Sequence, residues 1–464
     1  LHYPLRRQRQ MCIRDRILYF VINNRTWRNA VLLVSSLVFY SWGEPKYVFL
    51  MLASTLVAWL CGLGIDRFKE KRRISRAFLI ASLVLLLGSL AVFKYLNFFV
   101  ENLNRIDGVA LKVRNIALPI GISFYTFQIL SYLIDLYWEK VSVQKSYFRF
   151  TLYVCLFPQL IAGPIVRYET VEREISLRRE SWEEAVGGMR RFILGLAKKV
   201  LIANNVAAVA EYIYSSSSAG SGAYWLAAVC YTLQIYFDFS GYSDMAIGLG
   251  RIFGFHFDEN FRYPFVSKNI TEFWQRWHIS LGTFFRDYLL YVPIFGKRRK
   301  YLNLFLVWFC TGFWHGANWN YIIWGLYFGL FILIERTIGN KNMRKMPKAL
   351  AHIYNTIVVV VGFGIFYFTD LGKLGTFLGN LVGLNGNSFV DKISTQNMTA
   401  NAWLFIVSVA LCMPVVPALK KKLESMNYYL ATSVGQTVLN VAVFALSSIL
   451  LVNATNNPFI YWQF

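Results

Sequence analysis

The chain has 464 residues, of which 48 are Lys or Arg and 25 are Asp or Glu, so its formal net charge is +23. Only 16% of the residues are charged, whereas 56% are hydrophobic and 17% are aromatic. Soluble domains are about one quarter charged and less than half apolar. This composition therefore excludes an ordinary soluble enzyme and indicates a protein embedded in lipid. The same apolar content excludes a disordered chain.

The positive charges are gathered in short clusters between apolar runs. A nucleic-acid-binding protein would concentrate them on one polar domain, so we expect no nucleic-acid partner. Short basic loops are typical of the cytoplasmic side of a membrane protein, and we place the first cluster there. The clusters lie at 67–76, 297–300, 341–348 and 420–422.

The first 16 residues, LHYPLRRQRQMCIRDR, are strongly basic and precede an apolar fragment, ILYFVI, that is too short to span a bilayer. They lack the apolar core and the small-residue cleavage site of a signal peptide, and they resemble translated sequencing adapter. We therefore expect residues 1–16 to be a non-native basic segment without function. Residues 17–464 are expected to form a single membrane domain.

Apolar segments long enough to cross a bilayer recur along the chain. Four segments are clear spans and lie at 47–65, 77–93, 115–134 and 349–369. Four further segments contain polar, Pro or Gly interruptions and lie at 29–43, 150–166, 223–237 and 401–419. Two longer stretches without Asp, Glu, Lys or Arg, 301–334 and 425–464, each have room for a helix pair or a helix with a re-entrant piece. We predict an all-α polytopic membrane protein with about 10–12 transmembrane helices plus re-entrant and interfacial helices.

Polar residues inside apolar sequence are concentrated at 231–325. Charged groups inside a bilayer are costly and usually persist for function. His315 lies in a stretch without formal charge, between Gly312 and Gly316, which would allow close backbone approach or a helix break. His278 lies among aromatic and charged residues typical of a membrane interface. Each histidine is either a functional group or a neutral side chain satisfied by one hydrogen bond, and the pattern leaves both interpretations open.

The spacing of the polar residues argues against several kinds of catalytic site. Neither His278 nor His315 has a His, Cys or carboxylate three or four residues further on, so we predict no metal site. No GxSxG motif occurs, and the six cysteines lie far apart without a CxxC pair. A histidine acting as general base on a hydroxyl remains, a role that contributes about 10² to 10⁴ in rate. Asp238, in an apolar helix, either orients a partner or forms a pair between helices.

Three motifs resemble those of the membrane-bound O-acyltransferase family. They are QIYFDFSGYSDMAIGLGRIFGF, NFRYPFVSKNITEFWQRWHISLGTFFRDYL and GFWHGANWNYIIWG. The resemblance extends from about Val31 to Phe464. Within the family, the chain resembles the bacterial branch that contains alginate O-acetyltransferases and D-alanyl transferases of teichoic acid. The SWGEPKY opening and the RDYL stretch favour the alginate type.

The resemblance implies roles for individual residues. His315 in WHGANW is the expected catalytic base, and His278 in RWHISL is the second essential histidine. Further candidates for substrate binding or positioning, with packing or an interfacial role as the alternative, are Trp314, Asn318, Arg286 and Asp238.

The resemblance also implies a function. We expect a multi-pass enzyme of the bacterial cytoplasmic membrane that takes an acyl group from a cytoplasmic thioester. The acyl group is expected to be acetyl, and the thioester is expected to be acetyl-CoA or an acylated carrier protein. The acceptor is expected to be a hydroxyl of an exported or cell-wall polysaccharide, reached directly or through an extracytoplasmic acetyltransferase partner, with no bound cofactor. D-alanyl transfer to teichoic acid is the alternative within the family. A polysaccharide or lipid transporter and a non-catalytic scaffold are the alternatives outside it.

Overall fold

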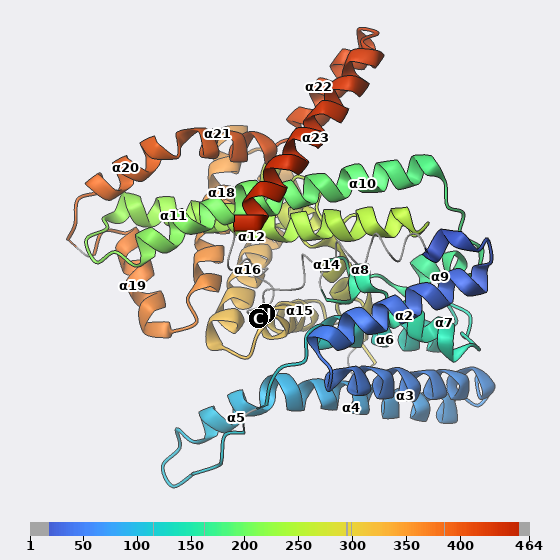
Figure 1. The fold of residues 1–464 in the computed structure, drawn as a ribbon. Coiled ribbons are helices and arrows are strands. Elements are labelled where there is room, and N and C mark those ends of the chain that lie inside the picture. Colours follow the sequence, from blue (N-terminus) through green and yellow to red (C-terminus); the bar gives the residue numbers. More distant parts are fainter. Residues whose placement is uncertain are drawn as a thin grey trace. The chain divides into compact units, whose positions relative to one another are not determined.

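The computed structural model describes residues 18–453 apart from 115, 162, 294–295, 298 and 385. Over these residues the regular elements are all helical, without a strand, which confirms the all-α prediction (Figure 1). The segment 1–16, expected to be non-native, lies outside the described residues.

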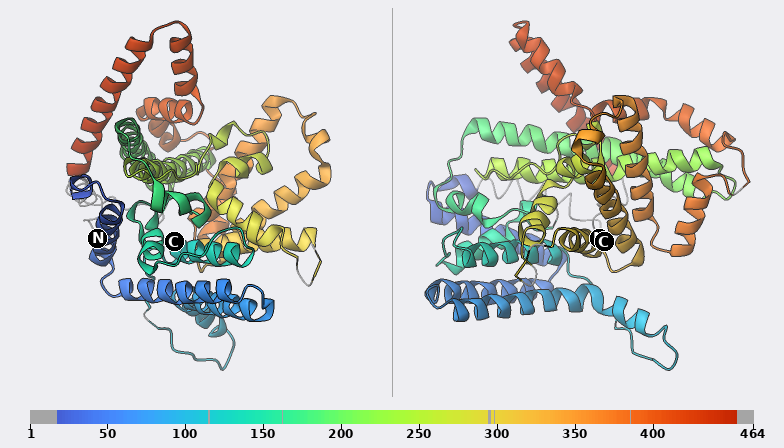
Figure 2. Two further views of the ribbon diagram at one scale, coloured as in Figure 1. Left: turned by 90° about the vertical axis from the view of Figure 1, so that its right-hand side faces the viewer. Right: turned by 180° about the vertical axis from the view of Figure 1, so that it is seen from behind.

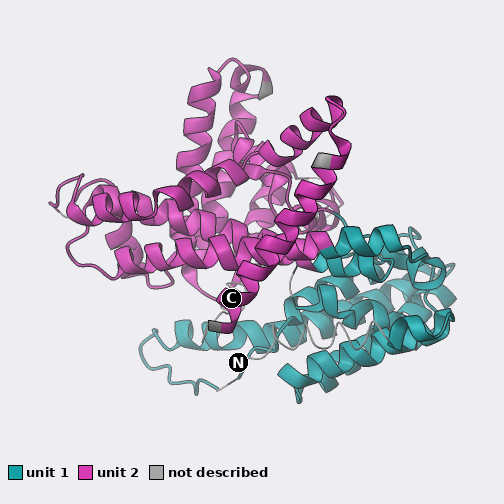
Figure 3. Ribbon diagram, turned by 45° about the horizontal axis from the view of Figure 1, so that its top comes forward, with its two compact units in different colours: residues 1–189, 246–258 teal, residues 190–245, 259–464 magenta. Residues whose placement is uncertain are grey.

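The chain forms two compact units, coloured separately in Figure 3. Unit 1 comprises residues 1–189 and 246–258, and unit 2 comprises residues 190–245 and 259–464. Helices α10 (Trp182–Ala197) and α12 (Ser221–Ile252) each contribute residues to both units. Two compact units can belong to one domain or to two, so the expected single domain over 17–464 stays a prediction.

Unit 1 is built from helices of very different lengths. Its remaining elements are α2 (Arg25–Gly43), α3 (Tyr47–Arg67), α4 (Arg72–Leu90), the π-helical turn η1 (Ala91–Tyr95), α5 (Leu96–Leu103), α6 (Ile122–Tyr137), α7 (Tyr147–Cys155), α8 (Phe157–Leu160) and α9 (Tyr168–Leu177). Helices α3 and α4 lie side by side in all views (Figures 1 and 2).

Helix α6 forms the core of unit 1, since nearly all of its side chains are buried. It begins after Gly121, whose φ of +77° is a left-handed conformation that glycine adopts at little cost. A Cβ at this position would lie 2.6 Å from the carbonyl oxygen of Leu160, so a larger residue would also clash. Glycine therefore allows the chain to turn tightly into α6 beside α8.

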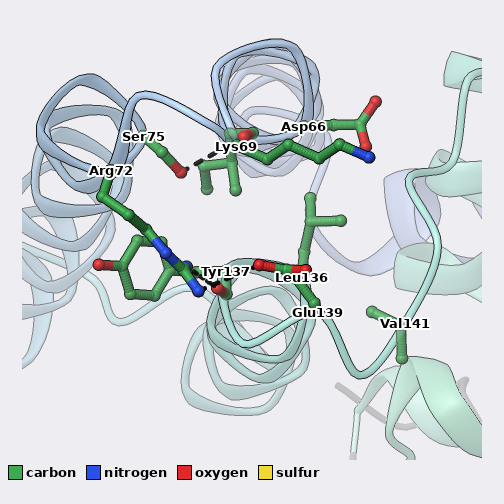
Figure 4. A pocket seen from close by; sticks show the side chains of 9 residues that line it. Asp66, Lys69, Arg72, Ser75, Leu136, Tyr137, Glu139 and Val141 are labelled. Atoms are coloured by element: carbon green, nitrogen blue, oxygen red, sulfur yellow. Dashed lines mark hydrogen bonds and ion pairs between the residues drawn. The ribbon is translucent and has the colours of Figure 1, made fainter.

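The loop between α3 and α4 is fastened to the end of α6. Arg72 donates a hydrogen bond of 2.9 Å to the carbonyl oxygen of Tyr137 and pairs with Glu139 at 3.0 Å. Together with Asp66 and Lys69 these residues line a hollow of about 150 Å³ (Figure 4). Because charges of both signs face the hollow, we interpret it as a clamp between helices.

Unit 2 contains the larger number of helices. They are η2 (Lys198–Ala203), α11 (Asn204–Tyr214), η3 (Pro264–Val266), α13 (Ile270–Arg276), α14 (Ile279–Phe285), η4 (Arg286–Leu290), α15 (Lys300–His315), α16 (Trp319–Ile338), α17 (Asn340–Met343), α18 (Lys348–Tyr367), α19 (Leu371–Leu381), α20 (Lys392–Ala400), α21 (Ala402–Leu411), α22 (Val415–Ser425) and α23 (Tyr429–Asn453).

Aromatic side chains fill the core of unit 2 between α13, α16 and α18. Trp274 of α13 lies edge-on to Phe328 of α16, with ring centroids 5.0 Å apart. Phe273 of α13 makes a similar contact with Phe363 of α18 at 6.4 Å. Such edge-to-face pairs add to the stabilisation from burial, so the aromatic residues that reflect a membrane environment also hold α13 in place.

Six helical segments among the described residues are long and apolar enough to cross a membrane. They are 47–67, 72–103, 182–214, 319–338, 348–367 and 432–452, and the bent pair α21–α22 would make a seventh. The protein is therefore a polytopic membrane protein. Many large apolar side chains on α3, α4 and α23 are exposed, as expected for helices in contact with lipid.

The other predicted spans correspond to shorter or more polar helices. The segment 301–334 forms the helix pair α15–α16, one of the two arrangements expected for it. The segment 150–166 divides into α7 and the single turn α8. Helices α6 and α15 have only 16 residues each, fewer than the roughly 20 that cross a bilayer. Helices α2 and α12 are long enough, with 19 and 32 residues, but are not among the six apolar segments.

Candidate active site

His315 is the last residue of α15 and lies where the chain reverses into α16. The reversal is tight because glycines line the contact between these helices. A Cβ at Gly312 would lie 2.2 Å from the carbonyl oxygen of Tyr321, and one at Gly325 would lie 2.3 Å from that of Trp308. The helix break expected around the glycines is confirmed, since α15 ends before Gly316.

Aromatic rings surround the imidazole of His315. Its ring centroid lies 4.9 Å from Trp314, 5.0 Å from Trp324 and 5.2 Å from Phe366. The residue is 6% exposed. A low-dielectric environment of this kind strengthens electrostatic interactions with any polar group that reaches the imidazole.

His278 joins α13 to α14 and is 2% exposed. Its φ of +44° is left-handed, a conformation that is uncommon for residues other than glycine. Burial lowers the pKa of its imidazole to about 3, so the ring is neutral at physiological pH. Strained backbone at a buried titratable residue is frequent at active sites.

Trp314 connects the two histidines. Its ring lies 6.0 Å from that of His278 and 4.9 Å from that of His315, in edge-on arrangements. The two histidines, 37 positions apart in the sequence, therefore belong to one buried aromatic cluster. The predicted positioning role of Trp314 is compatible with this placement and stays a prediction.

The other three candidates differ in burial and in their charged partners. Asp238 is buried and pairs with Lys199 of η2, which corresponds to the alternative of a pair between helices. Arg286 is exposed and pairs with the adjacent Asp287 at 2.7 Å. Asn318 is exposed and stands at the start of α16 without a side-chain capping bond. Their roles in substrate binding remain untested predictions.

Three residues near His278 were not predicted from the sequence. Asn260 and Ser280 are buried polar residues beside the imidazole, and Phe239 lies edge-on to it at 4.6 Å. All three fall within the quoted motifs, but none belongs to a residue type or a spacing that would single it out in the sequence. Among the described residues, no group of three or more His, Cys, Asp or Glu could hold a metal ion.

A cavity of about 690 Å³ lies in unit 2 between the ends of α11, α12, α18 and α19. Five tyrosines line it, Tyr214, Tyr224, Tyr231, Tyr321 and Tyr367, together with charged residues such as Asp370. Tyr321 also packs against Phe366, a neighbour of His315, and a Cβ at Gly316 would meet its ring at 2.3 Å. The wall of the cavity thus extends to the residue that follows His315.

The chain is similar to known proteins over most of its length. The model of the MBOAT, membrane-bound O-acyltransferase family, matches residues 139–375, about half of the chain, and includes both histidines. The "probable alginate O-acetylase AlgI" of Pseudomonas aeruginosa is 41% identical over 362 residues, covering 76% of this chain and 69% of that protein.

More distant relatives transfer acyl groups as well. The peptidoglycan O-acetyltransferase of Helicobacter pylori is 33% identical over 80% of this chain and 77% of its own length. The teichoic acid D-alanyltransferase of Bacillus subtilis is 28% identical over 52% of this chain and 65% of its own length. The chain belongs to the membrane-bound O-acyltransferase family and is a membrane-embedded acyltransferase.

Proposed function

We propose that the protein transfers an acetyl group from a cytoplasmic thioester, acetyl-CoA or an acylated carrier protein, to a hydroxyl of an exported polysaccharide. The observation that carries the proposal is the position of His315, buried in the membrane-embedded unit beside the wall of a tyrosine-lined cavity.

The charge pattern suggests from which side each substrate arrives. Helix α15 starts at a basic cluster, Lys297, Arg299 and Lys300, and its 16 residues rise about 24 Å to His315. Helix α18 starts at a second basic end, Lys348, and finishes at the cavity. If the basic ends are cytoplasmic, the cavity faces the opposite side, where an exported acceptor would be found.

The proposed reaction needs one base and no cofactor. The neutral imidazole of His315 accepts the proton of the acceptor hydroxyl while the oxygen attacks the thioester carbonyl carbon. The tetrahedral intermediate collapses, the carbon–sulfur bond breaks, and the departing thiolate takes the proton from the imidazolium. An acetyl ester and a free thiol result, and His315 returns to its starting state.

The lining of the cavity suits a polysaccharide acceptor. Tyrosine rings offer flat apolar faces on which sugar rings can stack, and their hydroxyls offer hydrogen bonds. Acetyl is preferred to D-alanyl because the relatives named for O-acetylation are more similar and covered over more of their length than the D-alanyltransferase. The polysaccharide is acetylated directly or through an extracytoplasmic transferase that receives the acetyl group first.

The test is a comparison of ester-linked groups on cell-envelope and secreted glycans. A host without such an enzyme would carry the gene and its neighbours with either the wild-type protein or His315→Ala, at equal membrane abundance. We expect ester-linked acetate to fall by at least about a hundredfold in the variant, because the general base is lost.

The matched control is His256→Ala, which removes an exposed histidine that pairs with Glu174 in unit 1. It should leave the acetate level unchanged. Loss of D-alanine instead of acetate would assign the protein to D-alanyl transfer. Equal acetate and D-alanine in wild type and His315→Ala would reject the proposed role of His315.

A further inference from the structure

Asn260 occupies a fixed position between α12 and α13. It is 0% exposed, and its carbonyl oxygen accepts a hydrogen bond of 3.0 Å from the amide of Ile279. Its neighbour Glu259 binds Arg191 at 2.6 Å, and Arg191 also pairs with Asp244 of α12 at 2.9 Å. This bridge fastens the loop that carries Asn260 onto α12.

The hydrogen bonds of Asn260 fix which way its side-chain amide points. Oδ1 accepts from the backbone N–H of Ser280 at 3.3 Å and from the Ser280 hydroxyl at 2.9 Å. Nδ2 donates to the hydroxyl oxygen of Ser243 at 3.1 Å. A flipped amide would place its NH₂ group against the backbone N–H of Ser280, so that two donors would face each other.

This orientation determines the protonation of His278. Nδ1 of the imidazole lies 3.2 Å from Oδ1 of Asn260, and an amide oxygen can only accept. The Ser280 hydroxyl also lies 3.5 Å from Nδ1, but it donates to Oδ1 of Asn260 at the shorter distance of 2.9 Å. The geometry therefore favours a proton on Nδ1 of the neutral ring, which leaves the lone pair on Nε2. Phe239 and Trp314, both edge-on to the imidazole, restrict its rotation.

We propose that Asn260 is a positioning residue that holds His278 in the Nδ1–H tautomer, so that Nε2 is the basic nitrogen offered to the reacting groups. The inference rests on the proposed acyl transfer for its consequence in catalysis, whereas the tautomer itself is independent of the reaction. It assigns to an amide the orienting task that a carboxylate or a carbonyl performs beside other functional histidines.

The first measurement is the ¹⁵N spectrum of the purified full-length protein with labelled histidine, in which protonated and bare ring nitrogens resonate far apart. His278→Gln identifies the signals of His278. We expect a protonated Nδ1 and a bare Nε2 in the wild type. A protonated Nε2 with a bare Nδ1 would overturn the proposal whether or not the protein transfers acetyl groups.

The second measurement compares two substitutions of Asn260. Asn260→Leu removes the acceptor, so we expect a mixture of tautomers and a fall of at least about tenfold in kcat with little change in KM for the thioester. Asn260→Asp retains an acceptor for Nδ1–H, so we expect the tautomer to persist. Its negative charge should also move the acidic limb of the pH–rate profile to higher pH, because a nearby carboxylate favours the imidazolium.

The matched control is Asn303→Leu. Asn303 is also 0% exposed, but its amide donates to the backbone carbonyls of Leu289, Leu290 and Val292. A general loss of packing would affect both Leu variants equally. If Asn260→Leu changes neither the ¹⁵N signals of His278 nor kcat beyond the effect of Asn303→Leu, the positioning role is rejected. If the wild type transfers no acetyl group, the proposed function fails and the ¹⁵N signals alone decide the tautomer.

Discussion

The carboxylate of Glu335 shows how one buried residue organises part of the candidate active site. It accepts hydrogen bonds from the backbone amides of Ile270 and Thr271 at 2.6 and 2.8 Å, and from the hydroxyl of Tyr354 at 3.1 Å. Glu335 belongs to α16, whereas the two amides open α13. One side chain thus fixes the start of the helix that leads to His278.

Loss of this carboxylate should loosen the first turn of α13. Glu335→Ala leaves two buried amides without an acceptor, each at a cost of about 1–3 kcal/mol. We expect a clearly lower Tm in detergent and reduced acetyl transfer, with an intermediate effect for Glu335→Gln, which keeps one oxygen. The control Glu424→Ala removes an exposed pair with Lys420 and should change Tm little. Equal Tm values for Glu335→Ala and Glu424→Ala would contradict this account.

Residues with a motif could be predicted from the sequence, whereas residues defined by a contact could not. His278, His315 and Trp314 could be predicted as site residues because they stand in long motifs, and their roles stay predictions. Asn260 was not predicted because its proposed role depends on contacts with Ser280 and on the orientation of an amide. For Arg286, the sequence could not show that its guanidinium pairs with the adjacent carboxylate.

At the scale of helices, close packing of α15 and α16 sets the position of His315. Gly312 and Gly325 face each other across this contact, where a Cβ at Gly325 would lie 3.0 Å from the Cα of Gly312. Glycines let two helix backbones approach closely inside a membrane, so van der Waals contacts between the backbones hold the helices together.

Gly312→Ala should therefore disturb the helix pair. The added Cβ would lie 2.2 Å from a backbone oxygen, so the helices must move apart. We expect a lower Tm and less acetyl transfer at equal membrane abundance. Gly435→Ala is the matched control, because a Cβ there has nothing within 4 Å, and the higher helix propensity of alanine should leave stability unchanged or slightly raised. An unchanged Tm in Gly312→Ala would refute the close contact.

The length of α12 illustrates what apolar periodicity cannot predict. The sequence indicated a span over 223–237, yet the helix continues to Ile252. Asp238 and Asp244 follow that span and would be costly in an apolar environment, but lysines of η2 pair with both of them. Pairing with lysine offsets the cost of burying each aspartate, so the helix can continue through both positions. The lysines lie about 40 residues before the aspartates in the sequence.

At the scale of the whole molecule, the distribution of basic residues predicts which side of the membrane each end of α18 faces. Lys345 and Lys348 stand at one end of α18 and Asp370 and Lys373 follow the other, so the basic cluster and the cavity are separated by one span. The positive-inside rule places the former end in the cytoplasm.

This topology can be tested with single cysteines in a protein whose six native cysteines are replaced by serine. A membrane-impermeant thiol reagent added to intact cells should label Lys373→Cys and not Lys345→Cys. Both should react after the cells are opened, which serves as the control for accessibility. Labelling of Lys345→Cys in intact cells would reverse the proposed sides and with them the entry of the acceptor through the cavity.

The fold class and the membrane location could be predicted from composition and apolar run length alone. The extent of individual helices could not, because interruptions such as the turn between α7 and α8 depend on tertiary contacts. The amide of Phe157, the first residue of α8, donates a hydrogen bond to the hydroxyl oxygen of Ser36 in α2, which precedes it by more than a hundred positions. A local pattern has no access to such a partner.

The left-handed backbone of His278 sets two properties of this position against each other. Glycine would adopt the same conformation without the cost of about 1–2 kcal/mol that a Cβ brings. Backbone strain alone would therefore rank glycine above histidine here. A role of His278 in acyl transfer would rank them in the reverse order, so residue preferences at position 278 would separate the requirements of the backbone from those of the proposed chemistry.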